Sequence, residues 1–168
     1  ANQSNTVSPV IDASRASAYV IKNLVNNSTD VTTPETTATG GDAQAKYVSR
    51  RVTLSQDFDA TRLKTYLKVN RSPETSIEVY YKALSSDDTT NFDDRPYVQM
   101  TRVDNGGDIN TAGRFEFIED EFEANTVSYT SDAGSFTNIR SFAVKVVFYT
   151  SNDAVVPKIK DLRVVALS

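Results

Sequence analysis

The 168-residue chain contains no cysteine, no histidine and no tryptophan. Without cysteine it can form neither a disulfide framework nor a thiolate metal site. Without histidine it lacks the side chain best suited to acid–base catalysis near neutral pH, and also the commonest zinc ligand. No serine or threonine can therefore be paired with a histidine base. These absences argue against an enzyme, and we expect a protein that works without catalysis and without a cofactor.

Charge and hydropathy restrict the partners further. The net charge is −4, whereas a nucleic-acid surface needs a clear excess of lysine and arginine along one face. The longest apolar run, residues 143–149, is interrupted by Lys145 and is too short to cross a membrane. We therefore expect neither a nucleic-acid partner nor a membrane span.

The dominant pattern along the chain is an alternation of apolar and polar residues with a period of two, which is the period of a β-strand. Leu63 and Val69 share one face of a predicted strand at residues 63–69. Residues 77–83 repeat the alternation, and a Ser-Pro dipeptide between the two segments supplies a turn. We expect these two strands to pair with each other in antiparallel orientation.

Further strands are predicted from shorter or less regular patterns. Residues 139–150 are apolar on both faces, which is typical of a central strand that is covered on both sides. About eight or nine strands separated by turn-rich loops favour an all-β fold, an antiparallel β-sandwich or jelly roll formed by a single domain at 16–168. The remaining predicted strands are 18–25, 47–54, 96–102, 114–118, 126–130 and 159–167.

Two regions do not have the strand pattern. Residues 1–15 resemble an extended N-terminal arm, whose apolar cluster Pro9, Val10 and Ile11 is a candidate to dock on this domain or on a neighbour. Residues 26–45 are rich in Asn, Thr and Gly and have almost no apolar side chains. We interpret them as a long, polar, exposed loop that becomes ordered when something covers it.

One acidic loop is a weak candidate for a metal site. It carries Asp87, Asp88, Asp93 and Asp94 within ten residues, and calcium prefers oxygen-rich loops of this kind. The spacing does not fit the calcium loop of alternating acids closed by a glutamate. A solvated connection in which aspartates cap turns is the favoured interpretation, so no metal site is predicted.

A second acidic stretch interleaves carboxylates with phenylalanine and isoleucine. Paired carboxylates can hydrolyse glycosidic bonds when burial keeps one of them neutral, so a hydrolase is a remote alternative. Consecutive acids on a strand usually face solvent, and a charged edge that discourages aggregation is the simpler interpretation. The acids concerned are Glu116, Glu119, Asp120, Glu121 and Glu123.

Three tyrosines are the candidate contact residues. Tyr66 and Tyr80 fall on the polar faces of their predicted strands beside lysines, and Tyr149 lies on the less regular face of the strand at 139–150. Aromatic rings exposed on a sheet can anchor a protein partner or stack on a sugar. Cross-strand packing is the alternative for each tyrosine taken alone, but three in one sandwich favour partner contact.

Much of the chain after residue 45 resembles a module of virion structural proteins in contractile-tailed bacteriophages, including those that infect cyanobacteria. The resemblance is carried by residues 46–67 (KYVSRRVTLSQDFDATRLKTYL), 77–88 (IEVYYKALSSDD), 92–100 (FDDRPYVQM), 142–148 (FAVKVVF) and 156–167 (VPKIKDLRVVAL). The resemblance implies a jelly-roll domain of the tail or baseplate, similar to galactose-binding sandwiches. It supplies no catalytic residues.

The resemblance, together with the missing catalytic side chains, gives the leading functional hypothesis. It implies a non-enzymatic assembly module in the virion, assembled in the host cytoplasm, that binds other virion subunits as a homo- or hetero-oligomer. The alternative is a carbohydrate-binding module that recognises host surface glycans, with Tyr66, Tyr80 or Tyr149 as stacking platforms. A hydrolase that uses the acids between Glu116 and Glu123 is a distant third.

Overall fold

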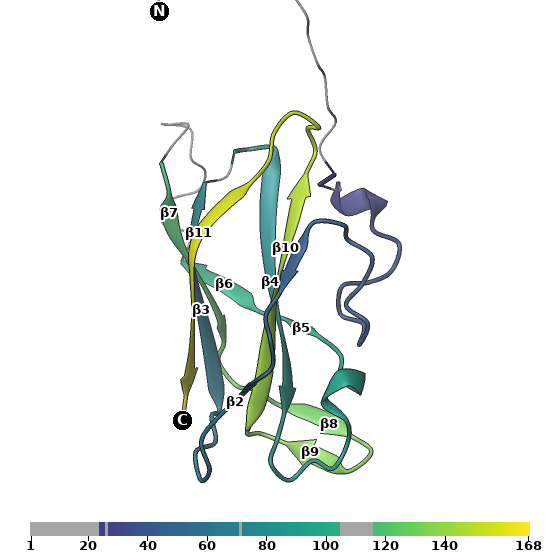
Figure 1. The fold of residues 1–168 in the computed structure, drawn as a ribbon, viewed down its shortest axis with the longest axis vertical. Coiled ribbons are helices and arrows are strands. Elements are labelled where there is room, and N and C mark those ends of the chain that lie inside the picture. Colours follow the sequence, from purple (N-terminus) through teal and green to yellow (C-terminus); the bar gives the residue numbers. More distant parts are fainter. Residues whose placement is uncertain (1–23, 26, 71, 105–115) are drawn as a thin grey trace, which may run out of the picture.

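The computed structural model describes residues 24–25, 27–70, 72–104 and 116–168, and it shows an all-β sandwich of antiparallel sheets (Figure 1). The only helical elements in these ranges are two short 3-10 turns, η1 (Ser28–Asp30) and η2 (Phe92–Asp94). In the described part of the chain, no helix has the length and apolar character needed to cross a membrane.

One layer is a five-stranded sheet built around two long strands that pair with each other. These are β4 (Thr75–Leu84) and β10 (Ser141–Thr150). The far edge of β10 is covered by β1 (Lys46–Val48) and β2 (Val52–Thr53), and the far edge of β4 by β5 (Val98–Gln99). The β10 strand is therefore central in its sheet.

The second layer is a four-stranded sheet in the order β11-β3-β7-β6. Its strands are β3 (Arg62–Asn70), β6 (Thr101–Asp104), β7 (Ile118–Ala124) and β11 (Lys158–Leu167). A small hairpin of β8 (Tyr129–Ser131) and β9 (Gly134–Phe136) lies at one end of the sandwich (Figure 1).

The core lies between the two sheets, where the alternating apolar residues of the long strands meet. Leu63, Leu67 and Val69 of β3 are fully buried, and they belong to the same cluster as Val79 of β4 and Val144 of β10. Burial of one such side chain stabilises the fold by about 1.5–3 kcal/mol. The period-two alternation thus records which face of each strand meets the opposite sheet.

The expectation that residues 63–69 pair with residues 77–83 is wrong. The β3 strand pairs with β11 and β7, whereas β4 pairs with β10 and β5, so the two strands belong to different sheets. Their apolar faces meet across the core instead of lying side by side. Alternation determines which face of a strand is buried, but it does not determine which strand is the neighbour.

The predicted strand at 96–102 is divided at Met100, where the chain passes from one sheet to the other. The β5 strand pairs with β4 in the first sheet, and β6 pairs with β7 in the second. Met100 is buried at this point, its N–H donates to the Val79 carbonyl at 2.8 Å, and its sulfur accepts from Thr65 Oγ1 at 3.4 Å. This crossing closes one side of the sandwich.

The other predicted elements have mixed outcomes. The strands at 139–150 and 159–167 are confirmed as β10 and β11, whereas the single strand expected at 47–54 is two short strands, β1, which begins one residue earlier at Lys46, and β2. The prediction at 126–130 overlaps β8 in part, and at 114–118 only residue 118 is in a strand among the described residues. The arm at 1–15, with Pro9, Val10 and Ile11, and most of the predicted strand at 18–25 lie outside the described residues. The jelly-roll assignment stays a prediction.

Candidate functional site

The outer face of the five-stranded sheet is covered by the polar segment 31–45, which we call the polar clamp. Figure 1 shows it on the side of β4 and β10 that faces away from the other sheet. Tyr97 N–H donates to the Thr36 carbonyl at 2.9 Å, and Ala43 is 2% exposed within a cluster of buried tyrosines. The segment is thus a loop that is exposed at many positions, as expected, but Glu35, Gly40 and Ala43 are buried against the sheet.

The clamp is attached to the sheet through one fully buried lysine, Lys145 on β10. Its Nζ donates to Glu35 Oε2 at 2.7 Å, to the Glu35 carbonyl at 2.5 Å and to the Gly40 carbonyl at 3.0 Å. It also lies over the rings of Tyr80 and Tyr97, at 4.7 and 4.4 Å from the ring centres. The ammonium thus has a carboxylate, two carbonyls and two aromatic faces as partners.

Two further lysines hold the same segment from neighbouring strands. Lys82 of β4 donates to the Ala38 carbonyl at 2.9 Å and to the Asp93 carbonyl at 3.0 Å. Lys46 of β1 donates to the carbonyls of Gly40 and Gly41, both at 2.9 Å. Three lysines on three adjacent strands therefore bind the main chain of the clamp, which explains how a segment almost without apolar side chains is ordered.

Burial determines the electrostatics of this region. It lowers the pKa of Lys145, and the neighbouring cations Lys46 and Lys82 lower it further, whereas the hydrogen bond to Glu35 opposes the shift. Burial also lowers the pKa of Lys82. Glu35 is 4% exposed and accepts from the Ala43 N–H at 2.8 Å through its second oxygen. A carboxylate bonded in this way balances a charge that would otherwise be costly to bury.

Tyr80 and Tyr149 are not exposed, contrary to the expectation from sequence. Both are 5% exposed and lie beneath the clamp, and Tyr80 Oη donates to Glu78 Oε2 at 2.5 Å. Burial raises the pKa of both phenols, with the Glu78 carboxylate as a further cause. Neither ring is available for a partner or a sugar in this structure. Tyr66 remains as the accessible member of the three.

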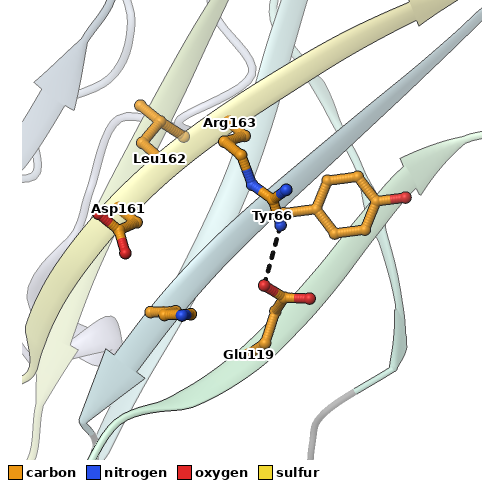
Figure 2. Close-up of a pocket in the computed structure, with 6 residues that line it drawn as sticks. Tyr66, Glu119, Asp161, Leu162 and Arg163 are labelled. Atoms are coloured by element: carbon orange, nitrogen blue, oxygen red, sulfur yellow. Dashed lines mark hydrogen bonds and ion pairs between the residues drawn. The ribbon is translucent and has the colours of Figure 1, made fainter.

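Tyr66 lies on the open outer face of the four-stranded sheet, beside a hollow of about 480 Å³ that Figure 2 shows. The Arg163 guanidinium lies 5.1 Å from the centre of the Tyr66 ring, and its Nη2 donates to Glu119 Oε2 at 3.0 Å. Three neighbouring strands, β11, β3 and β7, contribute the lining side chains, which are Tyr66, Lys68, Glu119, Asp161, Leu162 and Arg163.

The acidic stretch does not form a charged edge, because β7 lies between β3 and β6. Lys64 Nζ is 2.5 Å from Glu121 Oε1 and 3.5 Å from Glu123 Oε2 on the outer face. Asp120 faces the interior instead, is 1% exposed, and pairs with Arg102 at 3.0 Å. Glu116, at the start of this stretch, precedes the strand. The side chains on β7 thus alternate between an ion-paired outer row and the core.

The aspartate candidates for a metal site are dispersed. Asp88 is 6% exposed and accepts from the N–H and the hydroxyl of Thr90, at 2.9 and 2.7 Å, whereas Asp87, Asp93 and Asp94 are exposed. Within the described ranges, no three acidic side chains come together in a way that would hold a metal ion. The turn-capping role of Asp88 accounts for its position.

Sequence reasoning missed Glu35, Lys82 and Asp161. A signal for Glu35 was present, because Lys145 interrupts a strand that is apolar on both faces, and a buried lysine needs an acidic partner. Asp161 has a left-handed backbone, with φ 59°, at a β-bulge between Lys160 and Leu162. The alternation at 159–167 gives no sign of the bulge.

Comparison with known proteins adds no family to these observations. No protein-family model, curated protein or solved structure matches the chain.

Proposed function

We propose that the chain is a non-enzymatic structural module that binds neighbouring subunits of a phage virion, in the tail or baseplate. The virion setting is supported by the sequence resemblance of residues 46–67, 77–88, 92–100, 142–148 and 156–167. The binding role is supported by the edge of the five-stranded sheet formed by β1 and β2, which we call the β1–β2 edge.

The β1–β2 edge exposes an unusual amount of apolar side chain. Tyr47, Val48 and Val52 are 45%, 48% and 42% exposed within six consecutive residues. Single exposed apolar residues are ordinary, whereas a group of them marks an interaction surface. Arg50, between them, is exposed as well. Aromatic and arginine side chains are enriched at protein interfaces.

The main chain of this edge is also suited to pairing. Ala45 accepts from Phe148 N–H at 3.0 Å, and Ser49 N–H donates to the Val144 carbonyl at 2.8 Å, so both residues direct main-chain groups toward β10. In an antiparallel ladder this direction alternates, which turns the N–H and carbonyl groups of Lys46 and Val48 outward. An outward row of this kind is a template for a strand of another subunit.

A photo-crosslinking amino acid at position 47 tests the proposal. In purified particles that carry the chain, we expect a covalent adduct between position 47 and another virion subunit, identified by mass spectrometry. The matched control places the same group at Val98, which is 40% exposed on the opposite edge of the same sheet. Absence of the chain from particles, or equal adducts at both positions, would overturn the proposal.

A proline variant tests the pairing geometry. Because the Val48 N–H faces away from β10, Val48→Pro leaves the native ladder intact and removes one outward donor. We expect the adduct at position 47 to fall at least tenfold while the free energy of unfolding changes by less than about 1 kcal/mol. An undiminished adduct would rule out strand pairing as the mode of contact.

A further inference from the structure

The hollow beside Tyr66, which we call the Tyr66 hollow, has the composition of a site for a small polar ligand. It is hollowed out of the outer face of the four-stranded sheet (Figure 2), whereas the β1–β2 edge belongs to the other sheet. Its side chains combine one aromatic ring, two cations and two carboxylates. A few convergent polar groups beside an apolar surface are typical of ligand sites.

The ring of Tyr66 is held in place from one side. Tyr66 is half-buried, and the Arg163 guanidinium lies over its ring while donating a hydrogen bond to the Glu119 carboxylate. In the sheet register, Arg163 lies opposite Tyr66, so the guanidinium and the ring come from directly paired positions. An aromatic ring held by a neighbour offers an apolar surface at low entropic cost.

The bulge in β11 places an extra carboxylate at the rim of the hollow. Lys160 pairs with Lys68 and Leu162 pairs with Leu67, which leaves Asp161 without a partner residue in β3. A left-handed backbone is uncommon outside glycine, but aspartate tolerates it better than most residues. Bulges of this kind redirect a side chain, often beside a binding site.

Two of the charged groups in the hollow, Lys68 and Asp161, make no side-chain bond to the residues that the structure describes. Among the described residues, neither the Lys68 ammonium nor the Asp161 carboxylate is bonded to another side chain, whereas Arg163 and Glu119 bond to each other. Within the described part of the chain, the hollow therefore presents a donor and an acceptor that no other side chain occupies. The four charges sum to zero, which favours a ligand without net charge.

We propose that the Tyr66 hollow binds a neutral pyranose residue of a polysaccharide. The ring of Tyr66 stacks on the apolar face of the sugar. Each sugar hydroxyl both donates and accepts, so adjacent hydroxyls match Asp161 as acceptor and Lys68 as donor. The Arg163–Glu119 pair supplies a second donor and acceptor. This binding activity is independent of the assembly role.

A glycan array that contains neutral and acidic oligosaccharides gives the first test, followed by NMR titration of the wild-type chain with a bound neutral oligosaccharide. We expect saturable binding to neutral glycans, with shifts at Tyr66 and Asp161. Tyr66→Ala and Asp161→Asn should each weaken the affinity at least tenfold. Tyr47→Ala, which removes another half-exposed tyrosine, should leave the affinity within twofold.

Asp161→Gly separates binding from folding, because glycine adopts a positive φ freely and the fold should be retained. It removes the carboxylate, and we expect the same tenfold loss of affinity. Binding to acidic glycans alone, no binding at millimolar concentration, or binding that survives both Tyr66→Ala and Asp161→Gly would overturn the proposal. None of these outcomes alters the crosslinking result expected at the β1–β2 edge.

Discussion

Removal of the Glu35 carboxylate tests how the polar clamp is attached. In Glu35→Ala, the Lys145 ammonium loses a carboxylate partner at 2.7 Å, and the Ala43 N–H loses its acceptor at 2.8 Å. Removing one partner of a buried ion pair costs about 3–5 kcal/mol. Since Lys145 keeps the carbonyls of residue 35 and Gly40, we expect the lower end of this range, about 3 kcal/mol.

Urea unfolding followed by circular dichroism measures this loss, with tyrosine fluorescence as a second probe because the chain has no tryptophan. The matched control is Glu119→Ala. It removes a carboxylate from an ion pair of 3.0 Å whose side chains are 63% and 46% exposed, and exposed pairs contribute about 0–1 kcal/mol. Equal losses in the two variants would refute the view that burial makes the Glu35 pair important.

A double variant isolates the charge interaction from the packing. Lys145→Met alone leaves the Glu35 carboxylate buried without its cation, and we expect it to lose about 3–5 kcal/mol. Glu35→Leu combined with Lys145→Met removes both charges and should be more stable than Lys145→Met alone, since apolar replacement of a whole buried pair is often neutral. A double variant less stable than the single one would contradict the electrostatic explanation.

Two further predictions concern the residues around the clamp. Tyr80 and Tyr149 have a raised pKa in the folded state. The two neutral phenols therefore stabilise the fold fully below the unfolded pKa of about 10, and this stabilisation is lost as the pH rises above it. At pH 11 the two tyrosines together should lower the free energy of unfolding by roughly 3 kcal/mol relative to neutral pH. The buried lysines beside them act in the opposite direction, so the decisive measurement is the tyrosinate absorbance at 295 nm of the wild type minus that of Tyr80→Phe/Tyr149→Phe, which isolates these two rings among the eight tyrosines. This difference should appear only on unfolding, and its appearance in folded protein near pH 10 would contradict the prediction. Gly41 has φ +71°, and an added Cβ would lie 2.7 Å from the Glu35 Cα. Gly41→Ala should therefore lower the free energy of unfolding by at least about 2 kcal/mol. Gly40→Ala, at a similar φ of +89° but with its nearest atom 3.5 Å away on Tyr97, should cost less in the same urea titration, and equal costs would refute the steric argument.

The sequence predicted the buried faces of the strands more reliably than their neighbours. Alternation at β3, β4 and β11 and apolar character on both faces of β10 identify the side chains that leave water, because burial acts on each residue locally. Pairing depends on segments far apart in the chain. For β3 these are β11 and β7, and local periodicity contains no information about them. The expected β3–β4 pair failed for this reason.

At the candidate site, too, the sequence pattern did not reveal contacts between segments that are far apart in the chain. Tyr80 and Tyr149 alternate with buried residues and so were expected to be exposed, but a polar segment covers them. That segment attaches through lysine ammonium groups and main-chain carbonyls. Hydropathy does not detect contacts of this kind, because carbonyl groups are the same in every sequence. Tyr66 was identified correctly as accessible, whereas the bulge that brings Asp161 beside it was not.

The attachment of the clamp also has a consequence for the order of folding during synthesis. Glu35 and Lys145 are 110 residues apart, and β1 and β2, which follow the clamp, both pair with β10. Closure of such long loops makes folding slow. The β1 and β2 strands pair with no described strand that precedes β10. They must therefore wait until β10 has left the ribosome, and until then the apolar side chains of the β1–β2 edge are available to other molecules.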